Sequence, residues 1–317
     1  MSYDADSMEL LHRRLSKIQK ILVVLSGKGG VGKSTVATQV ATYLAHSDAT
    51  GLRRVGIIDV DLCGPDIPNL LSTRGGEVSS AMISLPDGSE EEVWMPSRAN
   101  GGSEHGQIYF VSMALLLGSE SDAVIWRGAR KDAMINELFR KVAWDRVDDG
   151  VEYLIVDSPP GTSDEHLTLF QLLSSYKQWR AEVDPKNRFT VGCVIVTTPQ
   201  LVATDDVAKM ISFCKTIGTD GCPEIVGLIE NMSGMYMCPH CQHGWPIFSN
   251  AGTEHTPQSP AEALAKRRDI PFLGSIPMNI KWSRPNYSQV GSIPFSPDGP
   301  VTAIVNKIEL FFDTKGE

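Results

Sequence analysis

The chain has 317 residues, a formal net charge of −9 and an apolar content of 42%. General nucleic-acid binding needs clustered positive charge, so this composition argues against DNA or RNA as a partner. No apolar run approaches the length that crosses a bilayer, and the opening residues M-S-Y-D-A-D are too acidic for a secretory or mitochondrial targeting segment. We therefore expect a cytoplasmic protein with no nucleic-acid partner and no membrane partner.

Apolar segments of strand length alternate with helical patterns along most of the chain. The strand-like segments are residues 21–25, 55–58, 108–113, 153–156, 191–196 and 225–229. This alternation predicts an α/β fold, a doubly wound and mostly parallel sheet with helices on both faces. We predict one domain over residues 1–317, with its core at 19–312. The polar stretches 75–106 and 178–187 are predicted to be surface insertions, the longer one a mobile loop with a hairpin at its edges.

Residues 27–35 read G-K-G-G-V-G-K-S-T and match the phosphate-binding pattern G-x-x-x-x-G-K-[ST]. A strand-like segment precedes them and a helical pattern follows, as this loop requires. Backbone N–H groups of such a loop and the positive end of the next helix cradle the phosphates of a nucleotide. Lys33 is expected to reach the β- and γ-phosphates, and Ser34 to bind Mg²⁺. A simple turn between strand and helix would explain the paired glycines but not the Gly-Lys-Ser that follows.

Acidic residues end two further strand-like segments. Asp157 follows residues 153–156 and is predicted to lie on the metal side of the nucleotide, while residues 158–164 (S-P-P-G-T-S-D) look like a loop that senses the γ-phosphate. Asp59 and Asp61 follow residues 55–58, and alternation along an extended strand places both carboxylates on the same side. A turn-capping carboxylate is an equally good interpretation of Asp59.

Two of the six cysteines, Cys238 and Cys241, form a C-x-x-C pair. Thiolates at this spacing can hold one edge of an iron–sulfur cluster or one soft metal ion. One pair is half of a four-thiolate set, so a [4Fe–4S] cluster held only by protein would bridge two chains. The alternatives are zinc, bound with His240 or His243 or in a Cys₄ site across a dimer, a redox pair, and an inert surface pair. The remaining cysteines are predicted to be packed small side chains: Cys63, Cys193, Cys214 and Cys222.

Taken together, these motifs resemble a known family. The residues that carry the resemblance are the lysine-doubled loop at 27–35, D-V-D-L-C-G-P-D-I-P at 59–68, D-S-P-P-G-T-S-D at 157–164, E-N-M-S at 230–233 and C-P-H-C at 238–241. They are similar to those of Mrp-type (ApbC-like) ATPases, which are grouped with the nitrogenase iron protein and the MinD/ParA ATPases. Over residues 21–277 the chain looks most like eukaryotic cytosolic iron–sulfur cluster assembly factors, in particular the short scaffold type without an N-terminal cysteine motif.

The resemblance implies a slow, Mg²⁺-dependent ATP hydrolase. Lys28 would reach the nucleotide of the other subunit in a dimer, Asp61 would position the attacking water, Thr35 would contact the α-phosphate and Asn231 would read adenine. Lys28, Lys33 and Asp61 are therefore the candidate catalytic residues. The full predicted nucleotide set is Gly27, Lys28, Gly29, Gly30, Val31, Gly32, Lys33, Ser34, Thr35, Asp59, Asp157 and Asn231.

Two positions depart from the family pattern. Asp66 stands where the family usually has serine, which adds negative charge near the bound phosphates, and Ala129 stands where it usually has proline. The change at Asp66 bears on the behaviour of the first switch loop.

The function implied is an ATP-dependent scaffold that assembles a labile [4Fe–4S] cluster at a dimer interface and transfers it to cytosolic and nuclear apo-proteins. Its expected partners are a second copy of the chain, a related subunit with an N-terminal cysteine-rich motif, and the apo-proteins. A cargo-positioning ATPase of the partitioning type, a zinc-bridged dimeric ATPase and a non-catalytic metal-binding adaptor are the alternatives.

Overall fold

A computed structural model describes residues 3–47, 53–62, 64–71, 78–85, 88–99, 107–116, 128–148, 150–218, 221, 223–237, 240–241, 243–246, 259–278 and 298–316. Its centre is an eight-stranded sheet with the order β12-β9-β8-β1-β7-β2-β6-β5. The pairs that join the first seven strands are parallel, and β5 pairs antiparallel with β6 at one edge. The predicted parallel sheet is confirmed.

The six strand-like segments predicted from the sequence all lie in this sheet. They are β1 (Lys20–Ser26), β2 (Arg54–Asp59), β6 (Gln107–Ser112), β7 (Tyr153–Asp157), β8 (Thr190–Thr197) and β9 (Glu224–Ser233). The two strands that the sequence analysis missed, β12 (Phe272–Pro277) and β5 (Ser97–Arg98), are the edge strands. An edge strand is covered less completely than a central one, so its apolar pattern is weaker.

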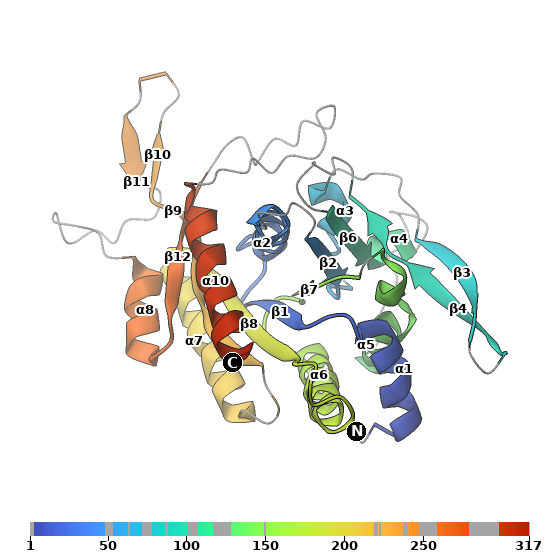
Figure 1. Ribbon diagram of the computed structural model, residues 1–317. Helices are drawn as coiled ribbons and strands as arrows, with labels where there is room; N and C mark the ends of the chain where they lie inside the picture. Colours follow the sequence, from blue (N-terminus) through green and yellow to red (C-terminus); the bar gives the residue numbers. More distant parts are fainter. Residues whose placement is uncertain are drawn as a thin grey trace.

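Helices cover both faces of the sheet (Figure 1). One face carries α2 (Lys33–Ser47), α3 (Ile67–Leu70) and α10 (Pro300–Gly316); the other carries α1 (Ala5–Leu15), α5 (Gly128–Lys141), α6 (Asp164–Val183), α7 (Leu201–Ile217) and α8 (Pro260–Arg268). Alternation along β1 separates the two cores, because Leu22 and Val24 pack under α2 whereas Ile21 and Val23 face α1 and α6. The remaining helical elements of the described residues are a short helix α4 (Met113–Leu116) and a 3₁₀ turn η1 (Trp144–Arg146).

The predicted core boundary at residue 19 is too late, because α1 belongs to the core. Asp4 caps the helix by accepting a hydrogen bond from the backbone N–H of Ser7. Leu11 and Leu15 are fully buried against the sheet. Arg14 is also buried and pairs with Glu91 and Asp145, which an isolated α-helical pattern cannot reveal.

Both predicted insertions contain regular structure, and a hairpin was expected for the longer one. Within 75–106, β3 (Ser79–Ser84) and β4 (Glu90–Met95) form an antiparallel hairpin, and Val93 of β4 is fully buried. Within 178–187, residues up to Val183 continue α6 and only 184–187 form a connection, although most side chains of the stretch are exposed. The buried Arg180 explains why the helix was not predicted to extend so far. Its guanidinium donates to the carbonyls of Leu15 and Ile18, so a charged residue is part of the buried packing.

A second small hairpin follows β9. It consists of β10 (Met235–Met237) and β11 (Gly244–Pro246), paired antiparallel with Met237 opposite Gly244. Figure 1 shows it standing away from the sheet, at the edge opposite the β3–β4 hairpin. Within the described ranges, every helix is too short or too polar to cross a membrane.

Candidate functional site: a phosphate-binding cleft and a cysteine hairpin

Three neighbouring strands bring the predicted nucleotide residues together. In the register of the sheet Asp157 of β7 lies beside Val24 of β1 and Asp59 of β2, so all three carboxyl ends meet at one edge. The loop at 27–35 leaves β1 here and enters α2. A cleft of about 440 Å³ is lined by residues 28–35 together with Asp61, Asp66 and Pro160. Ligands of open α/β sheets bind outside the carboxyl ends of the strands, as in this cleft.

The loop glycines are required by their backbone angles or by close neighbouring atoms. Gly30 and Gly32 have φ angles of +78° and +81°, a region that other residues rarely adopt. A Cβ added at Gly27 would lie 2.5 Å from the carbonyl carbon of Asp206 in α7. A Cβ added at Gly32 would collide with the side-chain nitrogen of Asn231 in β9. The loop is therefore fixed from two sides, by α7 and by β9, which the pattern of the motif alone did not indicate.

Lys33 and Asp157 meet inside the cleft. Nζ of Lys33 lies 2.6 Å from Oδ1 of Asp157 and 3.3 Å from Oγ of Ser34. Burial raises the pKa of Asp157 despite the lysine beside it. Oδ2 of Asp157 is buried without a hydrogen-bond partner among the described residues, so it is available to a group that enters the cleft.

Asp59 and Asp61 occupy different environments. Asp59 is fully buried: Oδ1 accepts from the backbone N–H of Asp61, and Oδ2 accepts from the hydroxyl of Ser112 at 2.9 Å. Burial raises the pKa of Asp59 well above its usual value, and the adjacent Asp157 raises it further. Asp61 lines the cleft and accepts a hydrogen bond from the backbone N–H of Gly64. The geometry of Asp59 is that of a turn-capping carboxylate, whereas Asp61 faces the space where phosphates would lie.

The loop after β7 is attached to β1. The backbone N–H groups of Ser158 and Gly161 donate to the carbonyls of Val24 and Ser26, and Gly161 has a φ of +77°. At the start of α6 the side chain of His166 accepts a hydrogen bond from the N–H of Ser163. Burial lowers the pKa of His166 to about 4, so the ring is neutral near pH 7.

The sequence analysis did not single out His166. The signal available for it was the Ser-x-x-polar spacing of a helix capping box, with histidine in the place of the usual glutamate or glutamine.

Lys28 belongs to the loop, and Asn231 contacts the loop from β9. Lys28 lines the cleft, is half-buried and forms no hydrogen bond or ion pair with the rest of the described chain. Asn231 is buried, and its Nδ2 donates to the carbonyl of Val31 at 2.9 Å. The predicted reader of adenine thus contacts the backbone of the loop itself.

The cysteine pair lies in the connection of the β10–β11 hairpin. Cys241 and its neighbours His240 and His243 are exposed, while Cys238 lies outside the described residues. Because strands flank the pair on both sides, it does not open a helix as a thioredoxin-like redox pair does. Among the described residues no cluster of histidine, cysteine and acidic side chains could hold a metal by itself.

Two of the four remaining cysteines can be placed. Cys193 in β8 and Cys214 in α7 are buried, as predicted, and form no disulfide. Cys63 and Cys222 lie outside the described residues.

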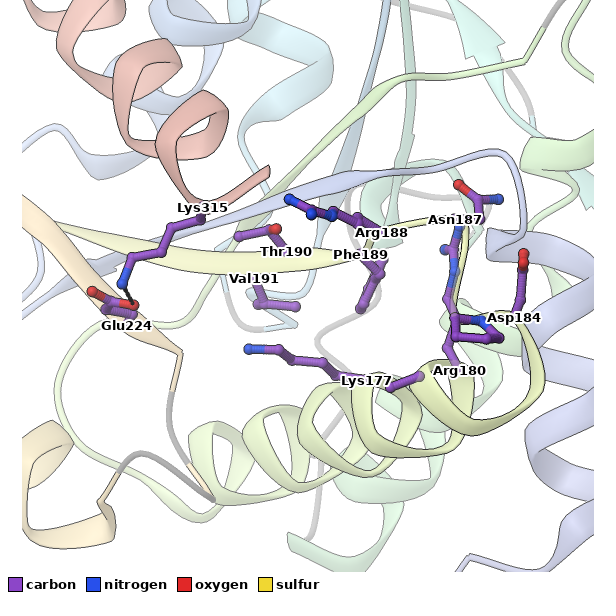
Figure 2. Close-up of a pocket in the computed structure, with 12 residues that line it drawn as sticks. Lys177, Arg180, Asp184, Asn187, Arg188, Phe189, Thr190, Val191, Glu224 and Lys315 are labelled. Atoms are coloured by element: carbon purple, nitrogen blue, oxygen red, sulfur yellow. Dashed lines mark ion pairs between the residues drawn. The ribbon is translucent and has the colours of Figure 1, made fainter. Parts of the chain in front are cut away.

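A second cavity, of about 300 Å³, lies at the opposite end of the sheet (Figure 2). Its lining comes from the end of α6, the starts of β8 and β9, and the end of α10, where Lys315 pairs with Glu224 at 2.9 Å. Arg180 in its wall is already engaged with backbone carbonyls. This cavity shares no residue with the phosphate-binding loop, which lines only the cleft at the carboxyl ends of the strands among the two.

Comparison with known sequences agrees with this geometry. A family model described as ParA, NUBPL iron-transfer P-loop NTPase, matches residues 17–309. The chain is 37% identical over 303 residues to a protein of Anopheles gambiae named cytosolic Fe-S cluster assembly factor Nubp2 homolog, covering 96% of this chain and all of that relative. It is 39% identical over 270 residues to cytosolic Fe-S cluster assembly factor NUBP2 of Gallus gallus, covering 85% and 83% of the two chains.

Solved structures share the fold. A nucleotide-binding protein from Archaeoglobus fulgidus in complex with ADP aligns with a TM-score of 0.57 and 27% identity over 91% of this chain and 98% of that one. The septum site-determining protein MinD from Pyrococcus horikoshii, complexed with Mg-ADP, aligns with a TM-score of 0.54 and 17% identity over 94% and 98%. The second similarity bears on the fold alone.

Proposed function

This chain belongs to the NUBPL iron-transfer P-loop NTPases of the ParA group, and from that premise we propose that it is an ATP-dependent scaffold for cytosolic iron–sulfur cluster assembly. One observation carries the proposal. The strand β9 bears Asn231, which contacts the phosphate-binding loop, and continues directly into the hairpin that holds Cys241. A nucleotide site and a thiolate pair separated by one short stretch of chain suit a protein that uses nucleotide to control a metal cargo.

The cleft fits a nucleotide triphosphate with Mg²⁺. The loop and the start of α2 supply N–H groups for the phosphates, and Lys33 is within a side-chain rotation of them. Ser34 and the unpartnered Oδ2 of Asp157 are oxygen donors of the kind that Mg²⁺ and its water ligands accept. Bound Mg²⁺ would neutralise charge on the β- and γ-phosphates. Asp61, which faces the cleft, is the residue proposed to orient the attacking water.

A dimer is proposed to complete both sites. Lys28 is not engaged by the described part of its own chain and lies at the cleft, where a second subunit's nucleotide can reach it. Leu201 and Val202, on the first turn of α7, are 61% and 64% exposed, and α7 packs against Gly27 of the loop. Exposed apolar residues beside the cleft support a protein contact on this face. One Cys238–Cys241 pair from each chain would then supply four thiolates to a [4Fe–4S] cluster.

The partners proposed are a second copy of the chain or a related subunit with an N-terminal cysteine-rich motif, and the apo-proteins that receive the cluster. The relatives' names, cytosolic Fe-S cluster assembly factors, support a cytosolic location and an assembly role. A partitioning ATPase would have no use for the cysteine pair. A zinc-bridged dimer would use the same thiolates, so zinc is the alternative that the experiment must separate.

Anaerobic reconstitution with iron and sulfide tests the proposal. We expect about four iron and four sulfide per dimer, with the broad visible absorption of an iron–sulfur cluster. Cys238→Ser and Cys241→Ser should abolish stable iron binding, whereas Cys193→Ser, at a buried packing position, should retain it. A full cluster on a strict monomer, a cluster that survives the double replacement, or zinc in place of iron after purification from iron-replete cells would overturn the proposal.

A further inference from the structure

The carboxylate of Glu230 gathers hydrogen bonds from three separate elements at the carboxyl end of β9. Oε1 accepts from the hydroxyls of Ser233 at 2.6 Å and Ser275 at 3.4 Å. Oε2 accepts from the hydroxyl of Ser259 at 2.6 Å and from the backbone N–H of Ala261 at 3.1 Å. Glu230 is only 1% exposed. Both oxygens of this buried carboxylate are therefore occupied within the protein, which fixes the groups that donate to them.

The partners of Glu230 stand on both sides of the cysteine hairpin in the sequence. Ser233 is the last residue of β9 before the hairpin, and Ser259 is the N-cap of α8, where the chain returns to the body of the protein. Ser259 also accepts from the N–H of Glu262 in the first turn of α8. One carboxylate thus joins the point where the chain leaves the body to the point where it comes back. Ser233 and Ser259 can therefore move relative to each other only if these bonds change.

The neighbouring residue Asn231 makes the opposite connection. Because side chains alternate along a strand, Glu230 faces α8 while Asn231 faces the phosphate-binding loop. Asn231 donates to the carbonyl of Val31, which belongs to the same peptide unit as the N–H of Gly32. In a trans peptide that N–H points away from the carbonyl, and the protein contains no cis peptide among its described residues. A phosphate that binds this N–H therefore acts on the same rigid peptide unit that Asn231 holds by its carbonyl.

The backbone of β9 is bulged between Asn231 and Ser233. The register of β9 with β12 passes from Asn231 opposite Ile276 to Ser233 opposite Pro277, which leaves Met232 as the extra residue. Met232 has a φ of +55°, a left-handed conformation that is unfavourable for a residue with a side chain. Hydrogen bonds of Asn231 and Glu230 hold the two residues before Met232. The residue after it, Ser233, is held by the hydrogen bond from its hydroxyl to Glu230, so the chain on both sides of Met232 is fixed.

We propose that Glu230 is a positioning residue for the cysteine pair, and that nucleotide acts on the hairpin through the path Val31–Asn231–Glu230. The biological role of this coupling rests on the proposed function, whereas the hydrogen bonds that would carry it do not. Phosphate binding shifts the Val31–Gly32 peptide, Asn231 follows, and the bulge at Met232 passes the shift to the bonds of Glu230 with Ser233 and Ser259. The accessibility of Cys241 then depends on whether nucleotide is bound.

The test measures the alkylation rate of Cys241 in the full-length protein without any cluster. Iodoacetamide labelling is followed at that residue by peptide mass spectrometry, with and without saturating Mg-ATP. In the unmodified chain we expect nucleotide to change the rate by a factor of about five or more, the lower end of ordinary coupling between two sites. Hydrogen exchange of the peptides 233–237 and 259–264 should change in parallel.

Three variants isolate Glu230. Glu230→Ala should bring the ratio of rates with and without nucleotide to about one, while nucleotide affinity stays within about twofold of the parent, because Glu230 does not touch the loop. Glu230→Gln should retain the coupling, since its amide can accept from Ser259 and Ala261 and donate to the serine hydroxyls on the other side. The matched control is Glu262→Ala, an exposed acid on the same helix turn, which should behave as the parent.

The outcomes separate the coupling from the proposed function. If nucleotide binds the parent chain but leaves the Cys241 rate and both peptides unchanged, the coupling is wrong. It is equally wrong if Glu230→Ala keeps the full nucleotide effect. If Glu230→Ala fails to fold, Ser259→Ala provides the same test, because it removes one of the two short bonds, and its coupling should fall below that of Glu262→Ala. A chain that shows the coupling yet never holds iron would refute the cluster function and leave the role of Glu230 intact.

Discussion

Lys33 and Asp157 neutralise each other inside the nucleotide cleft, with Nζ of the lysine 2.6 Å from Oδ1 of the aspartate and both side chains buried. Removing one partner of a buried ion pair leaves an uncompensated charge, which costs about 3–5 kcal/mol. The pair therefore affects stability as well as catalysis. Loss of ATP binding in a Lys33 variant has to be interpreted together with its stability.

We predict that Lys33→Ala lowers the free energy of unfolding by about 3 kcal/mol at pH 8, measured by urea denaturation. Without the lysine, burial raises the pKa of Asp157 further above its unfolded value. The folded state then binds more protons than the unfolded state, so the variant should gain stability as the pH falls from 8 towards 5. The double variant Lys33→Ala, Asp157→Asn should lose this pH dependence. An equal loss for the single variant at both pH values would contradict the prediction.

Lys28 and Lys33 should differ in nucleotide binding. Lys33→Ala is expected to remove productive ATP binding, because the amine lies inside the cleft beside Ser34. Lys28→Ala should keep much of the binding and abolish hydrolysis, because the proposed contact of Lys28 is with the nucleotide of a second subunit. Binding by calorimetry and phosphate release by a coupled assay give the two readouts. Equal loss of affinity in both variants would show that Lys28 serves its own loop.

ATP should bind more tightly than GTP. Asn231 offers the amide proposed for adenine, and the Asn306–Lys307 pair that superficially resembles a guanine-reading sequence lies within α10, away from any strand end. Competition against a labelled ATP analogue measures the preference. Displacement by GTP at the same concentration as ATP would refute it.

His166 should make stability depend on pH. Its pKa in the folded protein is about 4, below the ordinary value of 6.5, so between these values the unfolded state binds more protons. Stability contributed by the neutral ring is complete above pH 6.5 and declines as the pH falls towards 4, by roughly 3 kcal/mol in all. His166→Gln should reduce the slope of unfolding free energy against pH in this interval. His12, whose pKa burial also lowers, remains in both proteins and cancels in the comparison.

The central fold was predictable because its signals are local. The strands β1, β7 and β8 are buried on both faces, which gives the continuous apolar runs that mark a parallel sheet. The helix α1 and the last residues of α6 were missed because buried arginines, Arg14 and Arg180, take part in their packing. A charged residue normally indicates a surface, and its buried partners lie far away in the sequence.

The site shows the same division. The loop at 27–35 could be predicted because its spacing is dictated by phosphate chemistry. Asp59 could not be separated from Asp61 by sequence, since the hydrogen bond from Ser112 that distinguishes it comes from a strand more than fifty residues later, and Glu230 was noted only as part of a motif. The roles of these residues depend on partners from other elements, so the sequence provides their identity but not their geometry.

The buried contacts of α1 also bear on the order of events during synthesis. Arg180 donates to carbonyls of Leu15, Ser16 and Ile18, and Arg14 pairs with Glu91 and Asp145. The packing of α1 is therefore completed by residues translated long after it. Until α6 emerges, the apolar side of α1, with Leu11 and Leu15, has no native surface to cover it. In a nascent chain of this protein, α1 is therefore a binding stretch for a chaperone until α6 has been made.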